Sequence, residues 1–133
     1  MKLLVLGGTQ FVGRALVEEA LARGHEITLL NRNQSEPTGQ QLFGDRVRHL
    51  VGDRGDRGDD ASADLSALAG AERWDVVLDV AGYYPSAVRR TAEALAGRVG
   101  LYCFISSTSV FGDSIEEREG AFKAQGLAAP SVA

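Results

Sequence analysis

MKLLVLGGTQFVGRAL, residues 1–16, is the stretch that decides the fold. Leu3–Leu6 is an unbroken apolar run, which predicts a strand buried on both faces. Two glycines end the run, and from Phe11 the apolar residues recur at helical spacing, on a face formed by Val12, Leu16 and Ala20 with Val17 and Leu21 beside it. Such a strand–turn–helix unit directs the free N–H groups of the helix's first turn, and the helix dipole, at an anion such as a phosphate.

The glycine spacing allows more than one kind of phosphate site. Gly8 and Gly13 have the spacing of a P-loop, but Arg14-Ala15 stands where that motif requires Lys followed by Ser or Thr. This substitution argues against nucleotide hydrolysis. Two alternatives remain: a dinucleotide-binding turn, or a glycine turn that only packs the helix on the strand. The strand–turn–helix context favours the dinucleotide-binding turn.

The motif Gly7-x-x-Gln10-x-x-Gly13 resembles the G-x-x-G-x-x-G turn of the short-chain dehydrogenase/reductase superfamily, in its extended and atypical branches. Gln10 takes the place of the middle glycine. The Gly-Gly-Thr-x-Phe-x-Gly form is similar to that of NAD-dependent epimerase/dehydratase-like proteins, including the chloroplast stem-loop-binding branch. The resemblance implies a set of cofactor-binding residues: Gly7, Gly8, Thr9, Gln10, Phe11, Val12 and Gly13.

The second expected strand, Glu26–Leu30, bears on the choice of cofactor. A carboxylate at the end of this strand favours NAD through the ribose 2′-hydroxyl, whereas an arginine accommodates the 2′-phosphate of NADP. Here the strand ends in Asn31-Arg32, and no acid occurs before Glu36. We therefore assign Asn31 and Arg32 to the cofactor site and predict NADP, with NAD as the alternative. A solvated Arg32 on a loop is the competing interpretation.

The third expected strand, Val47–Val51, is followed by Gly52-Asp53. In the family that the chain resembles, a Gly-Asp at this position contacts the adenine edge. The resemblance therefore implies that Asp53 and the adjacent Arg54 belong to the cofactor site.

The fourth expected strand, Asp75–Val80, contains the carboxylate of Asp79 within its apolar run. A carboxylate inside a parallel strand is costly unless it finds donors. Asp79 either faces the crevice at the carboxyl ends of the strands or bonds to backbone near the glycine turn. After this strand, Ala81 and Gly82 resemble the small residues with which the family approaches the diphosphate and the nicotinamide ribose.

The fifth expected strand, Leu101–Ile105, runs into residues 106–112, SSTSVFG. This stretch resembles the family's Ser-Ser-x-x-Val-Tyr-Gly, with Phe111 in place of Tyr. The resemblance implies that Ser107 is the catalytic serine, which hydrogen-bonds the substrate beside the nicotinamide. The alternative is an ordinary polar strand exit whose Ser and Thr side chains cap the next segment.

The remaining segments are assigned from pattern alone. Asn33–Asp45 is predicted to be a loop, and Ala61–Ala69 a short helix with Leu65 and Leu68 inward. A helix from Pro85 is predicted to have one apolar face, formed by Val88, Ala92, Leu95, Ala96 and Val99. A charged helix is expected over Ser114–Gln125 and a frayed tail over Gly126–Ala133.

Strands that alternate with helices predict an α/β fold, a doubly wound parallel sheet of the Rossmann type with strand order 3-2-1-4-5. Residues 1–112 form the expected NAD(P)-binding domain, and residues 113–133 a charged C-terminal segment. The resemblance covers only the cofactor-binding part of the family's fold, so we expect a chain truncated after the fifth strand. Its open edge at Leu101–Ile105 predicts a homo-oligomer.

Composition narrows the function. The chain has 133 residues, a net charge of −4 and one cysteine, Cys103. The charge gives no electrostatic basis for binding nucleic acid or an anionic membrane, and the cysteine count and the N-terminus indicate a cytoplasmic protein. No metal site is predicted.

The resemblance implies the cofactor-binding part of an oxidoreductase or epimerase that acts on a small-molecule substrate. A non-catalytic NADP-binding or sensor module is the alternative, and an RNA-associated protein is less favoured because the pI is near 5.1. The family's Tyr-x-x-x-Lys pair is absent: Ala87, Val88 and Ser106 stand four residues after the three tyrosines. We therefore expect this chain to bind a cofactor without turning over a substrate.

Overall fold

The structure, a computed structural model, describes residues 1–55, 62–82 and 84–106. The predicted catalytic Ser107, the expected helix over Ser114–Gln125 and the expected tail lie outside the described residues.

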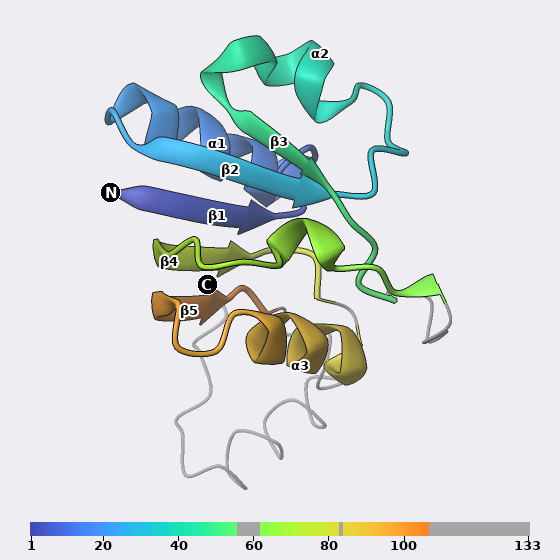
Figure 1. Cartoon of the computed structure of the whole chain (residues 1–133). Coiled ribbons are helices and arrows are strands. Elements are labelled where there is room, and N and C mark those ends of the chain that lie inside the picture. The colour runs from blue at the N-terminus through green and yellow to red at the C-terminus, as the bar shows by residue number, and fades with distance from the viewer. Residues whose placement is uncertain (56–61, 83, 107–133) are drawn as a thin grey trace, which may run out of the picture.

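Within these ranges the chain forms one sheet of five parallel strands in the order β3-β2-β1-β4-β5 (Figure 1). The strands are β1 (Lys2–Leu6), β2 (Glu26–Asn31), β3 (Arg48–Val51), β4 (Trp74–Asp79) and β5 (Val99–Phe104). The predicted fold class and strand order are confirmed, and the strand bounds differ from the predicted ones by one or two residues.

The pairing register brings the carboxyl ends of the strands to one edge of the sheet. Leu6 at the end of β1 lies opposite Leu30 of β2 and Asp79 of β4. Asp79 in turn lies opposite Phe104, the last residue of β5. The loops that leave these strands therefore start side by side, which is the arrangement that creates a binding crevice where the strand order reverses.

Helices cover both faces of the sheet. Helices α1 (Phe11–Ala22) and α2 (Gly39–Phe43) contribute Val17 and Phe43 to a core that includes Leu3 and Val5. The opposite core combines Leu4 and Leu6 with Leu68, in a 3₁₀ turn (Ser66–Leu68), and with Leu95 at the end of α3 (Pro85–Ala94). Successive residues of β1 thus point to different cores, which explains why this strand is apolar throughout.

The predicted apolar face of the first helix is partly wrong. Gly13, Val17 and Ala20 are buried, whereas Val12 is 56% exposed. The helix starts so close to the glycine turn that a Cβ at position 13 would collide with the carbonyl oxygen of Gly7. This contact turns Gly13 inward and leaves Val12 outside.

The predicted loop over Asn33–Asp45 contains α2, so that prediction is wrong for this segment. Thr38 caps the helix: its hydroxyl accepts a hydrogen bond from Gln41 N, and the Gln41 side chain accepts one from Thr38 N. This reciprocal pair is a capping box, whose T-x-x-Q pattern is visible in the sequence.

The predicted helix over Ala61–Ala69 is also wrong; within the described part of this segment helical backbone is limited to Ser62 and the turn Ser66–Leu68, both of the 3₁₀ type. Asp64 forms an isolated antiparallel bridge with Asp53, in which each backbone N–H donates to the other's carbonyl at 2.9 and 2.7 Å. Extended backbone at Asp64 cannot continue a helix. Leu68 is buried, as predicted, and Leu65 is half-buried.

The predicted face of α3 is partly wrong as well: among its members Leu95 is buried and Val88 half-buried. The buried positions are Ala87, Thr91 and Leu95, while Ala92 and Ala96 are exposed and Val99 belongs to β5. Hydrophobic spacing misplaced the face because a threonine occupies its centre. The Thr91 hydroxyl donates to the carbonyl of Ala87 at 3.0 Å, so it can be buried without an unmet hydrogen bond.

Candidate functional site

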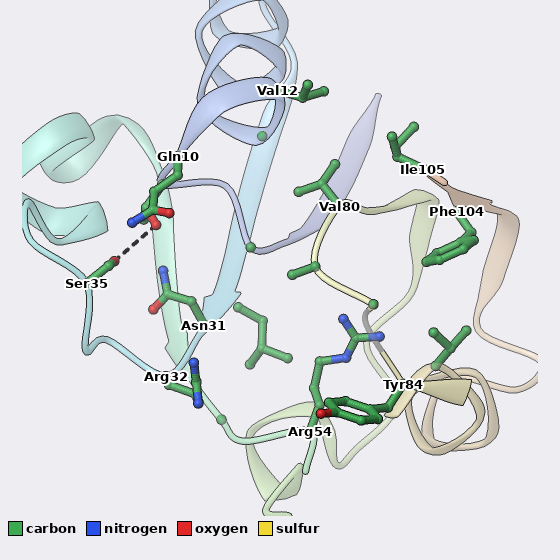
Figure 2. A pocket seen from close by; sticks show the side chains of 18 of the residues that line it. Gln10, Val12, Asn31, Arg32, Ser35, Arg54, Val80, Tyr84, Phe104 and Ile105 are labelled. Carbon is green, nitrogen blue, oxygen red and sulfur yellow. Dashed lines mark hydrogen bonds between the residues drawn. The ribbon is translucent and has the colours of Figure 1, made fainter. Parts of the chain in front are cut away.

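A cavity of about 1300 Å³ opens at the carboxyl ends of the strands (Figure 2). Its lining comes from the loops after β1, β2, β3, β4 and β5 and from the first turns of α1 and α3. The cavity is larger than the roughly 300–1,000 Å³ of an ordinary small-ligand pocket. An extended ligand that spans the crevice between β1 and β4 therefore fits its size.

The glycine turn forms the centre of the cavity wall. Gly7 has a φ of +83°, and a Cβ there would collide with the Cβ of Ala81. The turn therefore packs directly on the residue that follows β4, and only glycine allows this approach. The first intrahelical hydrogen bond of α1 runs from Arg14 N to Gln10 O at 3.2 Å, so the N–H groups of Phe11, Val12 and Gly13 precede the helical ladder.

Gln10 and Phe11 line the cavity beside this turn. Gln10 is the N-cap residue of α1, and its side chain makes no capping hydrogen bond. Phe11 has a φ of +43° and is 90% exposed, and Val12 beside it is 56% exposed. The helix N-terminus thus presents backbone donors framed by apolar side chains.

The segment after β2 forms a polar side of the cavity, where Figure 2 shows Gln10, Asn31, Arg32 and Ser35 near one another. The Ser35 hydroxyl lies 3.1 Å from that of Thr9, which ties this loop to the glycine turn. Asn31 Oδ1 accepts a hydrogen bond from Asn33 N at 2.9 Å. These contacts fix the loop so that Arg32 lines the cavity.

The opposite side is apolar. Val80, Phe104 and Ile105 lie together there in Figure 2, and Phe104 and Ile105 are 43% and 39% exposed. Ser106 also lines the cavity. One end of the crevice is therefore suited to charged and polar groups, and the other to a flat apolar group.

The lining is cationic. Among the described residues that line the cavity, Arg32, Arg54 and Arg89 are charged, and none is acidic. Because Arg54 is paired with the buried carboxylate of Asp79, Arg32 and Arg89 supply the positive charge of the lining. Although the chain carries a net charge of −4, the cavity favours an anionic ligand.

Most of the predicted cofactor-binding residues line this cavity: Gly7, Thr9, Gln10, Phe11, Val12, Gly13, Asn31, Arg32, Arg54, Ala81 and Gly82. Gly8 and Asp53 do not. Gly8 is buried, and a Cβ there would press on Leu29 and Val17. Asp53 uses its carboxylate to accept the N–H of Gly55 at 2.8 Å.

Arg54 differs from what the sequence suggests. Arg54 is only 4% exposed. Its guanidinium forms a bidentate ion pair with the carboxylate of Asp79, in which Nη1 donates to Oδ1 at 2.8 Å and Nη2 donates to Oδ2 at 2.6 Å. Asp79 is fully buried and also accepts the N–H of Ala81 at 3.3 Å. One of the two expectations for Asp79, a bond to backbone near the glycine turn, is confirmed by the Ala81 contact, because Ala81 packs on Gly7. Neither expectation included Arg54, the main partner of Asp79.

Tyr102 completes this cluster. Its hydroxyl donates to Asp79 Oδ2 at 2.6 Å. Burial raises the pKa of the Tyr102 phenol well above its ordinary value of 10.0, and the neighbouring Asp79 carboxylate raises it further. Tyr102 therefore stays protonated and bonded to Asp79, which makes it unsuited to exchange protons with a ligand.

Sequence reasoning missed several residues that line the cavity, namely Ser35, Val88, Arg89, Phe104, Ile105 and Ser106. The residues that come just after β4 and β5 could have been predicted from the rule that ligands bind beyond the carboxyl ends of parallel strands. Arg89 gives no such signal, because only the placement of α3 brings it to the rim.

The fold and the cavity together define the class: a domain of the Rossmann type, built as NAD(P)-binding domains of oxidoreductases and epimerases are. A model of the NAD dependent epimerase/dehydratase family matches residues 3–130. The chain belongs to this family, which confirms the resemblance drawn from its motifs.

Individual relatives agree with this assignment. The chain is 35% identical over 120 residues to the chloroplast stem-loop binding protein of 41 kDa b from Arabidopsis thaliana, and the match covers 83% of this chain and 30% of that protein. The chain thus spans about a third of the length of this relative.

Solved structures share the fold at lower identity. A UDP-galactose 4-epimerase superposes with a TM-score of 0.67 at 23% identity, over 86% of this chain and 41% of that one. A putative short-chain dehydrogenase/reductase from Burkholderia multivorans with bound NADP gives a TM-score of 0.61 at 19% identity, and the match covers 94% of this chain and 68% of that one.

Two further structural facts bear on the site. In the described ranges no helix is long and apolar enough to cross a membrane. Within the same ranges no group of three or more His, Cys, Asp or Glu side chains is placed to hold a metal ion.

Proposed function

We propose that the cavity binds a nicotinamide dinucleotide, with the diphosphate at the N-terminus of α1. The observation that carries this proposal is the glycine turn, which brings Phe11, Val12 and Gly13, whose N–H groups precede the helical ladder, to a cavity that Arg32 and Arg89 also line. The extent of the cavity and its division into a polar and an apolar side suit a ligand with an adenosine half and a nicotinamide half.

We further propose that the site prefers NADP to NAD. Arg32 lines the polar side, next to Asn31 and Ser35, where the ribose 2′-phosphate is expected, and no described lining residue carries a carboxylate that would repel it. A charge-assisted hydrogen bond from Arg32 would contribute about 1.5–3 kcal/mol to this preference.

Calorimetric titration with NADPH and NADH tests this preference. Arg32→Ala should weaken NADPH binding about 10- to 100-fold, because only NADPH carries the 2′-phosphate. The affinity of the same variant for NADH should stay within about twofold of the wild-type value. Arg73→Ala is the matched control, since Arg73 is exposed and lies just before β4, at the other end of the sheet. Equal affinity of the wild-type chain for NADPH and NADH would show that Arg32 does not select the cofactor.

For the chemistry, we propose an oxidoreductase or epimerase reaction in which these 133 residues hold the cofactor and do not supply the Tyr-x-x-x-Lys pair. The chain has no tyrosine with a lysine four residues later, and the Tyr102 hydroxyl is committed to Asp79. NADPH mixed with aldehydes, ketones and nucleotide sugars should therefore show no substrate-dependent loss of nicotinamide absorbance. Oxidation that disappears in a Ser107→Ala variant would overturn this proposal.

Association through β5 is a separate proposal. β5 is the last strand of the described sheet, and Leu101 on it is 60% exposed. An open apolar edge favours pairing with a second copy of the chain. Light scattering should find a dimer or larger species, and a monomer at high concentration would refute the proposal.

A further inference from the structure

A buried polar cluster lies beneath the cavity and is not explained by cofactor contacts alone. It consists of Arg54, Asp79, Thr91 and Tyr102, from the loop after β3, from β4, from α3 and from β5. Arg54 is the member that reaches the cavity, where Figure 2 shows it on the floor beside Tyr84.

The hydrogen bonds of the cluster fix the Arg54 guanidinium on three sides. Nη1 and Nη2 donate to the two oxygens of Asp79, and Nε donates to Thr91 Oγ1 at 2.9 Å. The side chains of the ion pair are 5% and 0% exposed. The positive charge of Arg54 is therefore matched by a fully buried carboxylate, and only a small part of the Arg54 side chain is exposed at the cavity.

This pairing makes Arg54 a poor phosphate ligand. A phosphate would have to compete with Asp79 for the same guanidinium, and a separated Asp79 would be left as a buried, unpaired charge. Stability alone does not explain the pair either, because buried ion pairs are often no more stabilising than apolar residues of similar volume.

The topology suggests another role. β3 and β4 are not neighbours, because β2 and β1 lie between them. The segment after β3 places Gly52 and Arg54 at the cavity, and the segment after β4 places Ala81 and Gly82 there. The ion pair joins these two segments directly, and Arg90 Nη1 also donates to the backbone carbonyl of Arg54.

We propose that Arg54 is a positioning residue whose ion pair with Asp79 sets the separation of the two cavity walls that a dinucleotide must touch at the same time. One wall follows β2 and β3 and includes Arg32 and Gly52; the other follows β4 and β5 and includes Ala81 and Phe104. This inference rests on the proposed dinucleotide binding and adds that the affinity for the whole ligand depends on the spacing of the walls.

The test compares ligands that touch one wall with a ligand that touches both. NADPH spans the crevice, 2′,5′-ADP represents its adenosine half, and reduced nicotinamide mononucleotide represents the other half. A ligand that joins two halves binds more tightly than either half only when the protein holds the two subsites at the matching distance. If the distance between the walls is no longer fixed, the affinity for the joined ligand should therefore fall while the affinity for each half is retained.

Arg54→Lys retains the charge and loses the two-pronged geometry. This variant should bind NADPH about tenfold or more weakly, whereas its affinity for each half-ligand should change by no more than about twofold. Thr91→Val removes the Nε acceptor together with the local hydrogen bond from Thr91 to the Ala87 carbonyl, and it leaves the ion pair in place. It should act in the same direction more weakly and serves if Arg54→Lys does not fold. Arg48→Lys is the matched control, because Arg48 starts β3 at the far end of the sheet and is exposed.

The outcomes separate the possible roles. Equal weakening of all three ligands would show that Arg54 only maintains the fold, and selective loss of 2′,5′-ADP would show that it binds phosphate; either result overturns the inference. If the wild-type chain binds none of the three, the proposed function fails, and this inference with it.

Discussion

Two clusters of charge lie at opposite ends of the same sheet and differ in their access to water. At the amino ends of the strands, Glu72 pairs with Lys2 and Arg48, and the three side chains are 26–54% exposed. At the carboxyl ends, Arg54 and Asp79 pair with almost no exposure. Water can replace each contact in the first cluster but none in the second. The buried cluster therefore determines geometry, and it lies at the end of the sheet where the cavity opens.

Breaking the buried pair should have the largest effect on stability. Asp79→Ala leaves the Arg54 guanidinium buried without a counter-charge, which should lower the free energy of unfolding by about 3–5 kcal/mol in a urea titration. Asp75→Ala on the same strand is the control; Asp75 is exposed and its carboxylate accepts the N–H of Lys2 at 2.6 Å, so its loss should cost about 1 kcal/mol or less. Similar losses for the two variants would remove the distinction between the ends of the sheet.

Tyr102→Phe should have an intermediate effect. It removes one hydrogen bond to a carboxylate, which should lower the free energy of unfolding by about 1–3 kcal/mol at neutral pH. Since the folded-state pKa of Tyr102 lies above its ordinary value of 10.0, this stabilisation is complete below that pH and is lost as the pH rises toward the folded-state pKa. Unfolding curves of the two proteins should therefore converge above about pH 10, and a gap that widens there would contradict the assigned contact.

Glu72→Gln should have the smallest effect, at most about 1 kcal/mol, and salt should reduce it further. The hydrogen bond from Lys2 lowers the pKa of the Glu72 carboxyl below its ordinary value of 4.5, and the charge of Arg48 lowers it further. Because the folded-state pKa is depressed, this contribution is present above the ordinary value and disappears as the pH falls through the folded-state pKa. Thermal unfolding at high and low salt measures this contribution to stability. If Glu72→Gln lowered the free energy of unfolding as much as Asp79→Ala does, the exposed cluster would be as important for stability as the buried pair.

The sequence predicts the sheet well because its strands are apolar runs and alternate with helical patterns. The Leu3–Leu6 run and the glycine turn, together with that alternation, suffice for the strand order, for the position of the crevice and for most of the cavity lining. These features depend on local pattern and on general rules of parallel sheets.

The failures of sequence reasoning share a physical cause. Thr91 and Asp79 are polar residues in the core, and both accept hydrogen bonds from Arg54, which lies 37 and 25 positions away from them in the sequence. A hydrophobicity pattern contains no information about such a partner, so it misplaces the face of α3 and leaves Asp79 unassigned. The bridge between Asp53 and Asp64 is likewise a long-range backbone contact that overrides local helix propensity.

Binding of a dinucleotide around the glycine turn can be observed directly in an amide-resolved NMR titration of the wild-type chain with NADPH. We predict saturable shifts at the amides of Phe11–Gly13, at Asn31 and Arg32, and at Ala81 and Gly82, because these line the cavity around the glycine turn. The amides near Lys2 and Arg73, at the other end of the sheet, should remain unchanged. An absence of saturable shifts at millimolar NADPH, or shifts confined to the amino ends of the strands, would contradict dinucleotide binding at this site.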